Sequence, residues 1–212
     1  MPETMNCALA PGFPDYVSAS RKVFRLALIC LSRPCQALEF ERDLLISLDE
    51  APLPRIPACL ALTLLDSTTP VWLSQSWKNA ESWLRFHRGA HICGEPEQAA
   101  FVFAASLREL PPLASLNQGS DRGPDSSATV ILASVLPLDG KNPLLAKGPG
   151  IDGAVVFSGH GLDNAFLKQW RGNRAGYPLG VDVFLAGDSF LAGLPRSVSL
   201  EDLPEDGERQ CM

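Results

Sequence analysis

Two short apolar runs near the carboxyl end, 181–186 and 189–194, constrain the fold more than any other part of the chain. Gly187-Asp188 separates them, and this pair can adopt the positive φ angles that tight hairpin turns require. The pattern predicts a β-hairpin. Asp182 lies inside its first strand between apolar neighbours, where a carboxylate is unfavourable unless it is hydrogen-bonded. Asp182 is therefore a candidate for either a catalytic or an architectural role.

The remaining periodicities alternate between helix and strand, which predicts an α/β protein. We expect strands at 36–41, 70–74, 99–104, 128–136, 144–146 and 154–158, and helices at 15–31, about 57–65, 78–88, 107–116 and after Asp163. In the first helix, the apolar face is expected to include Tyr16, Val23, Phe24 and Leu28.

Length and charge limit the function classes. The 212 residues fit one domain, expected to span 1–200, followed by a loose acidic tail at 201–212. The net charge of −6 and the pI near 5.1 argue against nucleic-acid binding. No apolar run approaches the roughly 18 residues of a membrane span, and the first residues do not resemble a secretory signal. We therefore expect a cytoplasmic protein that binds neither nucleic acid nor membrane.

The cysteine and histidine spacings do not predict a metal site. The six cysteines contain no CxxC pair, and Cys30 and Cys59 lie in apolar segments typical of buried, reduced thiols. His87 is expected to face inward near a helix end, where it is a ligand, a base or a side chain satisfied by a carbonyl; we favour the last. Gly89 interrupts the helix that would align His87 with His91.

A glycine pair after the strand at 154–158 raises the possibility of a phosphate loop. The segment Gly159-His160-Gly161 precedes a helix, as in nucleotide-binding loops. However, Asn164 occupies the position of the third small residue, and Asp163 is the expected N-cap, which places a negative charge where an anion would bind. Leu162 and Leu167 have the spacing of a hydrophobic staple. The segment therefore predicts a helix start.

Several short motifs lie along nearly the whole chain in the same order as in a known protein family. They are Phe24-Arg25-Leu26, Leu31-Ser32-Arg33-Pro34, Leu62-Thr63-Leu64-Leu65-Asp66, Thr69-Pro70-Val71-Trp72-Leu73, Leu84-Arg85-Phe86-His87, Gly148-Pro149-Gly150-Ile151, Tyr177-Pro178-Leu179-Gly180-Val181-Asp182 and Leu194-Pro195-Arg196. Together they resemble the PhnH family, the H subunits of the bacterial carbon–phosphorus lyase system. The chain departs from the family at Cys35, where glycine is usual, at His91, where proline is expected, and at Tyr177, where phenylalanine is commoner.

The resemblance implies a three-layer α/β sandwich with a mixed sheet, similar to the large domain of pyridoxal-phosphate-dependent transferases but without their cofactor site. The sequence agrees, because an internal aldimine needs a lysine. Of the five lysines, only Lys147, beside Gly148-Pro149-Gly150, is expected in a suitable strand-end loop. We accordingly expect no cofactor, no catalytic residue and no metal ligand.

The resemblance also implies a homodimer that joins the G, I and J subunits in a core complex. That complex displaces adenine from ATP to form a ribose 1-phosphonate 5-triphosphate, a step assigned to the I subunit. The J subunit then cleaves the C–P bond by radical chemistry. The favoured hypothesis is therefore an assisting, non-catalytic subunit in phosphonate catabolism.

Two further hypotheses concern individual side chains. The alternative function is a stand-alone transferase-like enzyme that uses Lys147 and Asp182 around a cofactor. Arg25, Arg85 and Arg196 are able to bind an anion or to anchor a carboxylate at an interface, and we favour the carboxylate. For Asp182 we favour a structural role, in which it accepts amides from the turn at 178–180 or pairs with an arginine.

Overall fold

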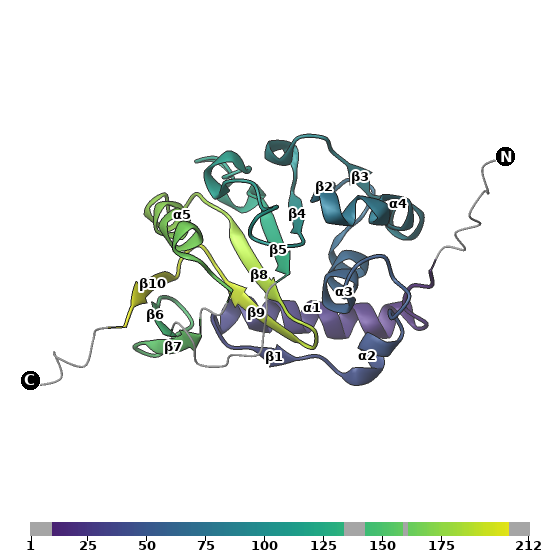
Figure 1. Ribbon diagram of the computed structural model, residues 1–212, viewed down its shortest axis with the longest axis horizontal. Coiled ribbons are helices and arrows are strands. Elements are labelled where there is room, and N and C mark those ends of the chain that lie inside the picture. Colours follow the sequence, from purple (N-terminus) through teal and green to yellow (C-terminus); the bar gives the residue numbers. More distant parts are fainter. Residues whose placement is uncertain (1–9, 134–142, 159–160, 204–212) are drawn as a thin grey trace, which may run out of the picture.

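A seven-stranded mixed sheet forms the centre of the protein (Figure 1). The computed structural model describes residues 10–133, 143–158 and 161–203. The strands are β1 (Leu38–Glu39), β2 (Pro70–Leu73), β3 (His91–Ile92), β4 (Phe101–Ala104), β5 (Thr129–Ala133), β8 (Asp182–Ala186) and β9 (Phe190–Leu194). Their order is β1-β9-β8-β5-β4-β2-β3. The neighbouring pairs β3–β2, β2–β4, β4–β5 and β5–β8 are parallel, whereas β8–β9 and β9–β1 are antiparallel. The expected α/β class with a mixed sheet is confirmed.

The central strands are buried on both faces, which explains their continuous apolar sequences. Successive residues of β4 alternate between two cores: Phe103 belongs to the core on one face, and Val102 and Ala104 belong to the core on the other. The same alternation occurs in β5, where Ile131 lies between Val130 and Leu132. Each face must therefore be covered by further elements.

Helices cover the first face. They are α1 (Tyr16–Ser32), α2 (Arg42–Ile46), α3 (Arg55–Leu64) and α4 (Glu81–Arg88), and a 3₁₀ turn at Gln75–Ala80 precedes α4. The backbone of β9 approaches α1 so closely that a Cβ at Gly193 would lie 2.3 Å from the carbonyl oxygen of Cys30. This contact admits only small side chains on the helix.

Because of this close contact, α1 buries a partly different set of residues from the one expected. Its buried residues are Ala19, Val23, Ala27 and Cys30. Tyr16, Phe24 and Leu28, which were expected on the inner face, are exposed. The prediction of the helix was correct, but its inner face was misassigned because the large side chains do not fit against β9.

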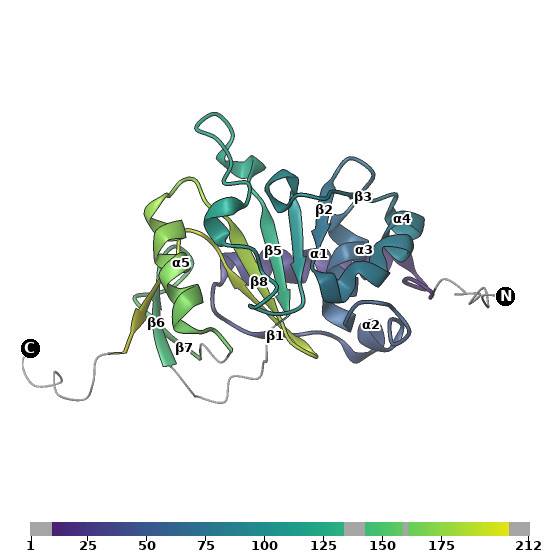
Figure 2. The same cartoon turned by 45° about the horizontal axis from the view of Figure 1, so that its top comes forward.

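A helix and a small sheet cover the second face (Figure 2). The helix is α5 (Asn164–Ala175), and the antiparallel sheet has the order β10-β6-β7, formed by Ser199–Asp202, Pro143–Lys147 and Val155–Ser158. Asp163 caps α5 by accepting a hydrogen bond of 2.7 Å from the amide of Phe166. Leu162 and Leu167 are buried on either side of this cap. The predicted helix start is confirmed, whereas Gly159 and His160 lie outside the described residues.

Several element boundaries differ from the expectations. The predicted helix at 107–116 is reduced to a 3₁₀ turn at Leu113–Ser115, because Pro111-Pro112 cannot donate the hydrogen bonds of a helix. The hairpin forms as predicted, but neither Gly187 nor Asp188 has a positive φ. Glu201 and Asp202, expected in the tail, pair with β6 as part of β10.

The described cysteines are reduced and buried, as predicted for Cys30 and Cys59. Burial raises the pKa of the Cys30, Cys35 and Cys59 thiols to about 12. Their thiols therefore remain protonated at neutral pH and are poor metal ligands or nucleophiles. No helix in the described part of the chain combines the length and hydropathy needed to cross a membrane.

Candidate functional site

Asp182 is held by a single arginine. The amide of Arg196 donates to Asp182 Oδ1 at 2.8 Å and Nε donates to the same oxygen at 3.1 Å. Nη2 donates to Oδ2 at 2.6 Å, and Nη1 binds the carbonyl oxygen of Pro124 at 2.8 Å. The side chains of Arg196 and Asp182 are only 12% and 20% exposed. The Asp182–Arg196 pair therefore joins the start of β8 to the segments that contain Arg196 and Pro124, as expected for an architectural role.

The turn before β8 is held by a different residue from the one we expected. Asn173 on α5 accepts the amide of Val181 at 2.8 Å and donates to the carbonyl oxygen of Val181 at 2.9 Å. Gly180 has a φ of 122°, and a Cβ there would lie 2.8 Å from Asn173 Oδ1. Asp182 does not bind the amides of 178–180; the amide of Gly180 donates to the carbonyl oxygen of Gln118. The sequence signal that could have predicted this contact was an Asn on the face of the helix that packs against the protein.

A shallow pocket of about 360 Å³ lies beside the Asp182–Arg196 pair. Its walls include Tyr177 and four prolines: Pro124, Pro149, Pro178 and Pro195. The peptide bond between Tyr177 and Pro178 is cis. Because both oxygens of Asp182 accept hydrogen bonds from Arg196, this carboxylate is engaged in the fold and is a poor partner for a pyridinium or a substrate.

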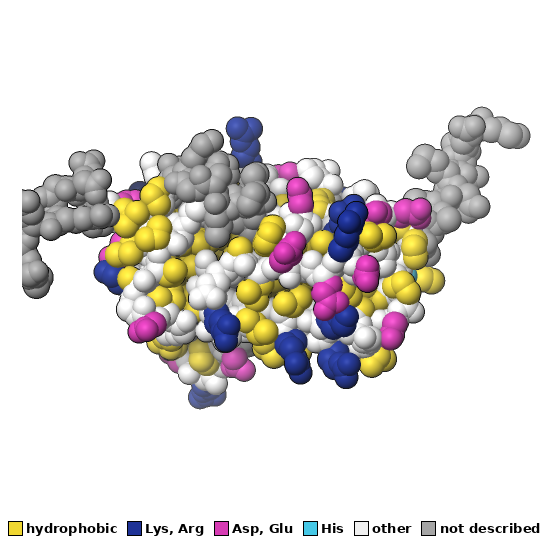
Figure 3. All heavy atoms as spheres, turned by 90° about the horizontal axis from the view of Figure 1, so that it is seen from below, with side chains coloured by type: hydrophobic (Ala, Val, Ile, Leu, Met, Phe, Trp, Pro, Cys, Tyr) yellow, Lys and Arg dark blue, Asp and Glu magenta, His cyan; other side chains and the backbone are white. Residues whose placement is uncertain are grey.

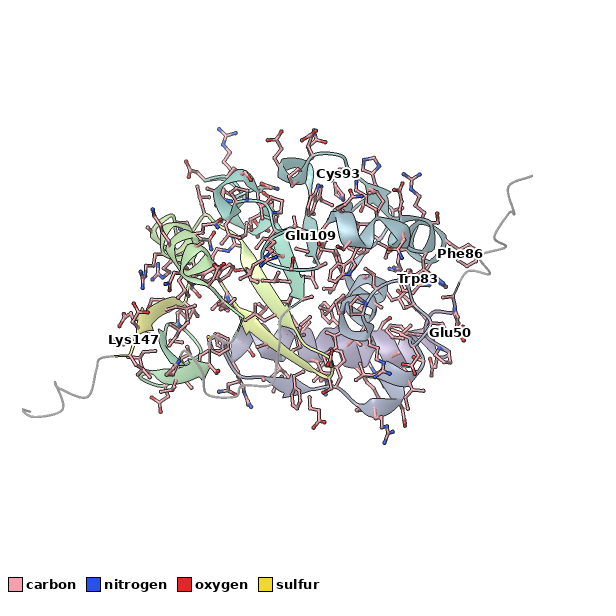
Figure 4. The ribbon with its side chains drawn as sticks, viewed as in Figure 1. Glu50, Trp83, Phe86, Cys93, Glu109 and Lys147 are labelled. Carbon is pink, nitrogen blue, oxygen red and sulfur yellow. The ribbon has the colours of Figure 1, made fainter. Side chains whose placement is uncertain are left out.

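Lys147 is also engaged elsewhere. It is the last residue of β6, its side chain is 47% exposed, and Nζ binds Glu201 Oε2 of β10 at 2.8 Å. Figure 4 shows Lys147 in the small sheet at one end of the molecule. Lys147 is not among the residues that line the pocket beside Asp182. The two residues that an aldimine-forming site would require therefore do not form a common site for pyridoxal phosphate.

A second cleft, of about 440 Å³, lies at the carboxyl ends of β4 and β5. Open parallel sheets usually bind ligands at this edge. The polar side chains that line the cleft are Ser106, Arg108 and Asp163, together with apolar residues and Gly161. Asp163 places negative charge at the start of α5, which disfavours a phosphate there.

The two pockets lie at opposite ends of the parallel strands, the pocket beside Asp182 at the amino ends and the second cleft at the carboxyl ends. In the β5–β8 register, Asp182 pairs with Thr129, and the far ends pair as Ala186 with Ala133. Five residues of extended strand span about 13 Å. Asp182 is thus at the amino edge of β8, away from the cleft that Ala133 lines.

Beyond the second cleft, a carboxylate stabilises the segment that follows β4. Glu109 accepts hydrogen bonds from the amide and hydroxyl of Ser76 at 2.8 and 2.5 Å. These bonds lower the pKa of the Glu109 carboxyl. Ser74 accepts the amide of Ala105 at 3.1 Å. Glu109 therefore stabilises a loop and does not position a reacting group.

The two histidines in the described residues, His87 and His91, have separate surroundings. His87 Nε2 lies 3.0 Å from the carbonyl oxygen of Ala10, to which it donates, and its ring packs against Trp83 and Phe86. His91 is exposed on β3, beyond the left-handed cap at Gly89. No group of three or more potential metal ligands occurs within the described ranges.

Two of the three candidate arginines bind carboxylates of the chain itself. Arg196 pairs with Asp182, and Arg85 Nη2 pairs with Glu81 at 2.7 Å within α4. Arg25 instead lines a groove beside α1. Arg196 and Arg85 thus anchor carboxylates within the chain, whereas anchoring at an interface stays a prediction.

Comparisons with known proteins agree with the sequence motifs. The family model described as "Bacterial phosphonate metabolism protein (PhnH)" matches residues 11–201. The chain belongs to the PhnH family. The match extends from the segment before α1 to β10, so it covers both cores and the Asp182–Arg196 pair.

Two curated relatives support the assignment. Over 192 residues, which are 90% of this chain and 94% of the relative, the chain is 35% identical to the alpha-D-ribose 1-methylphosphonate 5-triphosphate synthase subunit PhnH of Rhizobium meliloti (strain 1021). It is also 35% identical over 105 residues, 49% of this chain and 52% of the relative, to the putative C-P lyase subunit protein HtxG of Stutzerimonas stutzeri.

Proposed function

We propose that this PhnH-family protein is an assisting subunit of the carbon–phosphorus lyase core complex in organic phosphonate catabolism. The similarity to the Rhizobium meliloti synthase subunit over 90% of the chain carries this proposal. In this role the protein supports the formation of ribose 1-phosphonate 5-triphosphate from ATP and a phosphonate, and catalytic groups come from other subunits.

The proposal includes an assembly and a place of action. The chain, as a single domain at 1–200, forms a homodimer when alone and joins the G, I and J subunits in the cytoplasm. Its fold is similar to the large domain of pyridoxal-phosphate-dependent transferases without the cofactor site. The ion pairs Lys147–Glu201 and Asp182–Arg196 support the absence of that cofactor, because each occupies a group that the cofactor would need.

Co-expression with the G, I and J subunits tests the assembly. Native mass spectrometry of the purified complex should show this chain at a defined stoichiometry. A complex of the three other subunits without this chain would contradict the proposal. The isolated chain should release no adenine from ATP in the presence of a phosphonate, and release of adenine would make it a catalytic subunit.

The alternative function, a transferase-like enzyme, is tested separately. Incubation with pyridoxal phosphate and reduction with borohydride would attach the cofactor to Lys147 if an aldimine formed. We expect no specific mass shift at this lysine, because Glu201 holds its ammonium group in the small sheet. Modification of Lys147 that is abolished by Asp182→Ala would favour the alternative.

A further inference from the structure

Helix α1 presents an apolar stripe to solvent. Val17, Phe24 and Leu28 are 75%, 49% and 52% exposed. Their spacings of seven and four residues place them within about 40° of one another around the helix. The stripe, defined as these three residues, lies on the side of α1 opposite the buried Ala19, Val23 and Cys30.

A basic flank borders the stripe. Arg21, Lys22 and Arg25 follow it around the helix, and all three are exposed. The 17 residues of α1 contain no Asp or Glu, although the whole chain carries a net charge of −6. Lys22 pairs with Glu41 at 2.5 Å, whereas Arg21 and Arg25 have no ion pair with any residue in the described ranges.

The flank also forms one wall of a groove. The groove, of about 580 Å³, runs between α1 and the segment of β1, and its lining includes Arg21, Arg25, Leu26 and Ile29 on one side and Glu39 on the other. In the view from below, hydrophobic side chains lie among charged side chains of both signs across this side of the molecule (Figure 3). The surface therefore combines apolar area, a concave part and unpaired guanidinium groups.

We infer that the stripe and the basic flank of α1 form a docking surface for an acidic and apolar surface of a partner subunit. The inference rests on the proposed function, since it supplies the surface through which the chain joins a complex. Apolar anchors next to arginines are the composition of interface centres, and Arg21 and Arg25 complement carboxylates on the partner.

The charge pattern argues against a second copy of this chain as the occupant. A two-fold contact centred near Phe24 brings the same face of both copies together. It would place Arg21 and Arg25 of one copy close to the same residues of the other. The helices carry no acid, and of the two acids across the groove Glu41 already pairs with Lys22, which leaves one Glu39 per copy against two arginines. An acidic partner has no such conflict. The homodimer is then expected to use a different surface.

The test compares two variants with matched controls in the co-expressed complex. Phe24→Asp disrupts the stripe, and its control is Phe86→Asp, which changes another exposed aromatic (67% exposed, against 49% for Phe24) at the end of the molecule opposite Lys147 (Figure 4). The double variant Arg21→Glu/Arg25→Glu reverses the flank. Its control, Arg122→Glu/Lys168→Glu, makes the same change of net charge at two other exposed residues, neither of which lines a described pocket.

We expect both α1 variants to bind the other subunits roughly tenfold or more weakly, in a titration of the isolated chain against the subcomplex that lacks it. The controls should bind like the wild type. Thermal unfolding and the oligomeric state of each isolated variant should be unchanged, because the altered side chains are exposed.

Four outcomes would overturn the inference. Unchanged binding of the α1 variants to the subcomplex would show that the partner docks elsewhere, while leaving the proposed function intact. Loss of the isolated homodimer in Phe24→Asp would identify the stripe as a contact between copies. Binding of the wild type, but not of Arg21→Glu/Arg25→Glu, to phosphatidylglycerol vesicles would identify it as a membrane contact. Failure of the wild type itself to assemble would remove both proposals.

Discussion

At the scale of single residues, Asp182 shows how a carboxylate in an apolar strand becomes architectural. Three groups of Arg196 donate to it, and the same guanidinium reaches the carbonyl oxygen of Pro124. Removing the acceptor leaves the amide, Nε and Nη2 of Arg196 without their partner in a largely buried position. The pair therefore contributes through satisfied hydrogen bonds more than through net attraction of charges.

Asp182→Ala should lower the free energy of unfolding by about 2 kcal/mol, because it leaves a partly buried charge and an amide unpaired. Urea unfolding followed by circular dichroism measures the change. Asp182→Asn, which keeps one acceptor oxygen, should lose less. If stability were unchanged and only the activity of the assembled complex fell, Asp182 would have a functional role instead.

Cys35 allows a second prediction at this scale. It is the non-glycine residue with a positive φ, 63°, among the described residues. The resemblance described above leads us to expect glycine at this position. A Cβ in this conformation costs roughly 1 kcal/mol, and glycine carries no such cost. Both Cys35→Gly and Cys35→Ala remove the buried thiol, so their difference reports the backbone strain of alanine, offset in part by its buried Cβ and by the larger entropy loss of glycine on folding.

We therefore expect Cys35→Gly to be more stable than Cys35→Ala by about 1 kcal/mol. Paired thermal or urea unfolding curves measure this difference. Equal stabilities would mean that the backbone of the variants relaxes out of the left-handed region.

At the scale of elements, the contact between α1 and β9 depends on Gly193. Gly193→Ala would place a methyl group against the Cys30 carbonyl and should destabilise the protein by about 3 kcal/mol, since backbone atoms must separate. Gly172→Ala is the matched control. It lies inside α5 with nothing within 4 Å of its added Cβ, so it should stabilise by roughly 0.5–1 kcal/mol. In equilibrium unfolding experiments, the two variants should change the free energy of unfolding in opposite directions. An unchanged free energy of unfolding for Gly193→Ala would contradict the close packing.

At the scale of the whole molecule, we expect the large sheet and the small sheet to differ in local stability. Strand β5 is central in the large sheet and buried on both faces, whereas β7 is at an edge of the small sheet and leaves Val156 exposed. Hydrogen exchange should therefore be slowest for the amides of Val130–Leu132. We expect the β7 amides to exchange at least about tenfold faster, through local opening. Equal protection of both strands, read by mass spectrometry, would mean that the small sheet opens only with global unfolding.

Local pattern determined much of the architecture. The apolar runs that became β2, β4, β5, β8 and β9, the Asp163 cap and the buried Cys30 and Cys59 were all predicted from residues close together in the chain. Such features depend on periodicity and capping, which act within a few residues. The motif order also identified the family, which the match to residues 11–201 confirmed.

Contacts between distant residues were decided only by the tertiary structure. The sequence showed that Asp182 needed a partner, but only the fold selected Arg196, 14 residues away, and assigned the preceding turn to Asn173. Likewise, the helical pattern of α1 did not reveal which apolar residues face inward, because the close approach of β9 at Gly193 admits only the small ones. The composition of a helix determines that it has an apolar face, whereas the space left by its neighbours determines which face is buried.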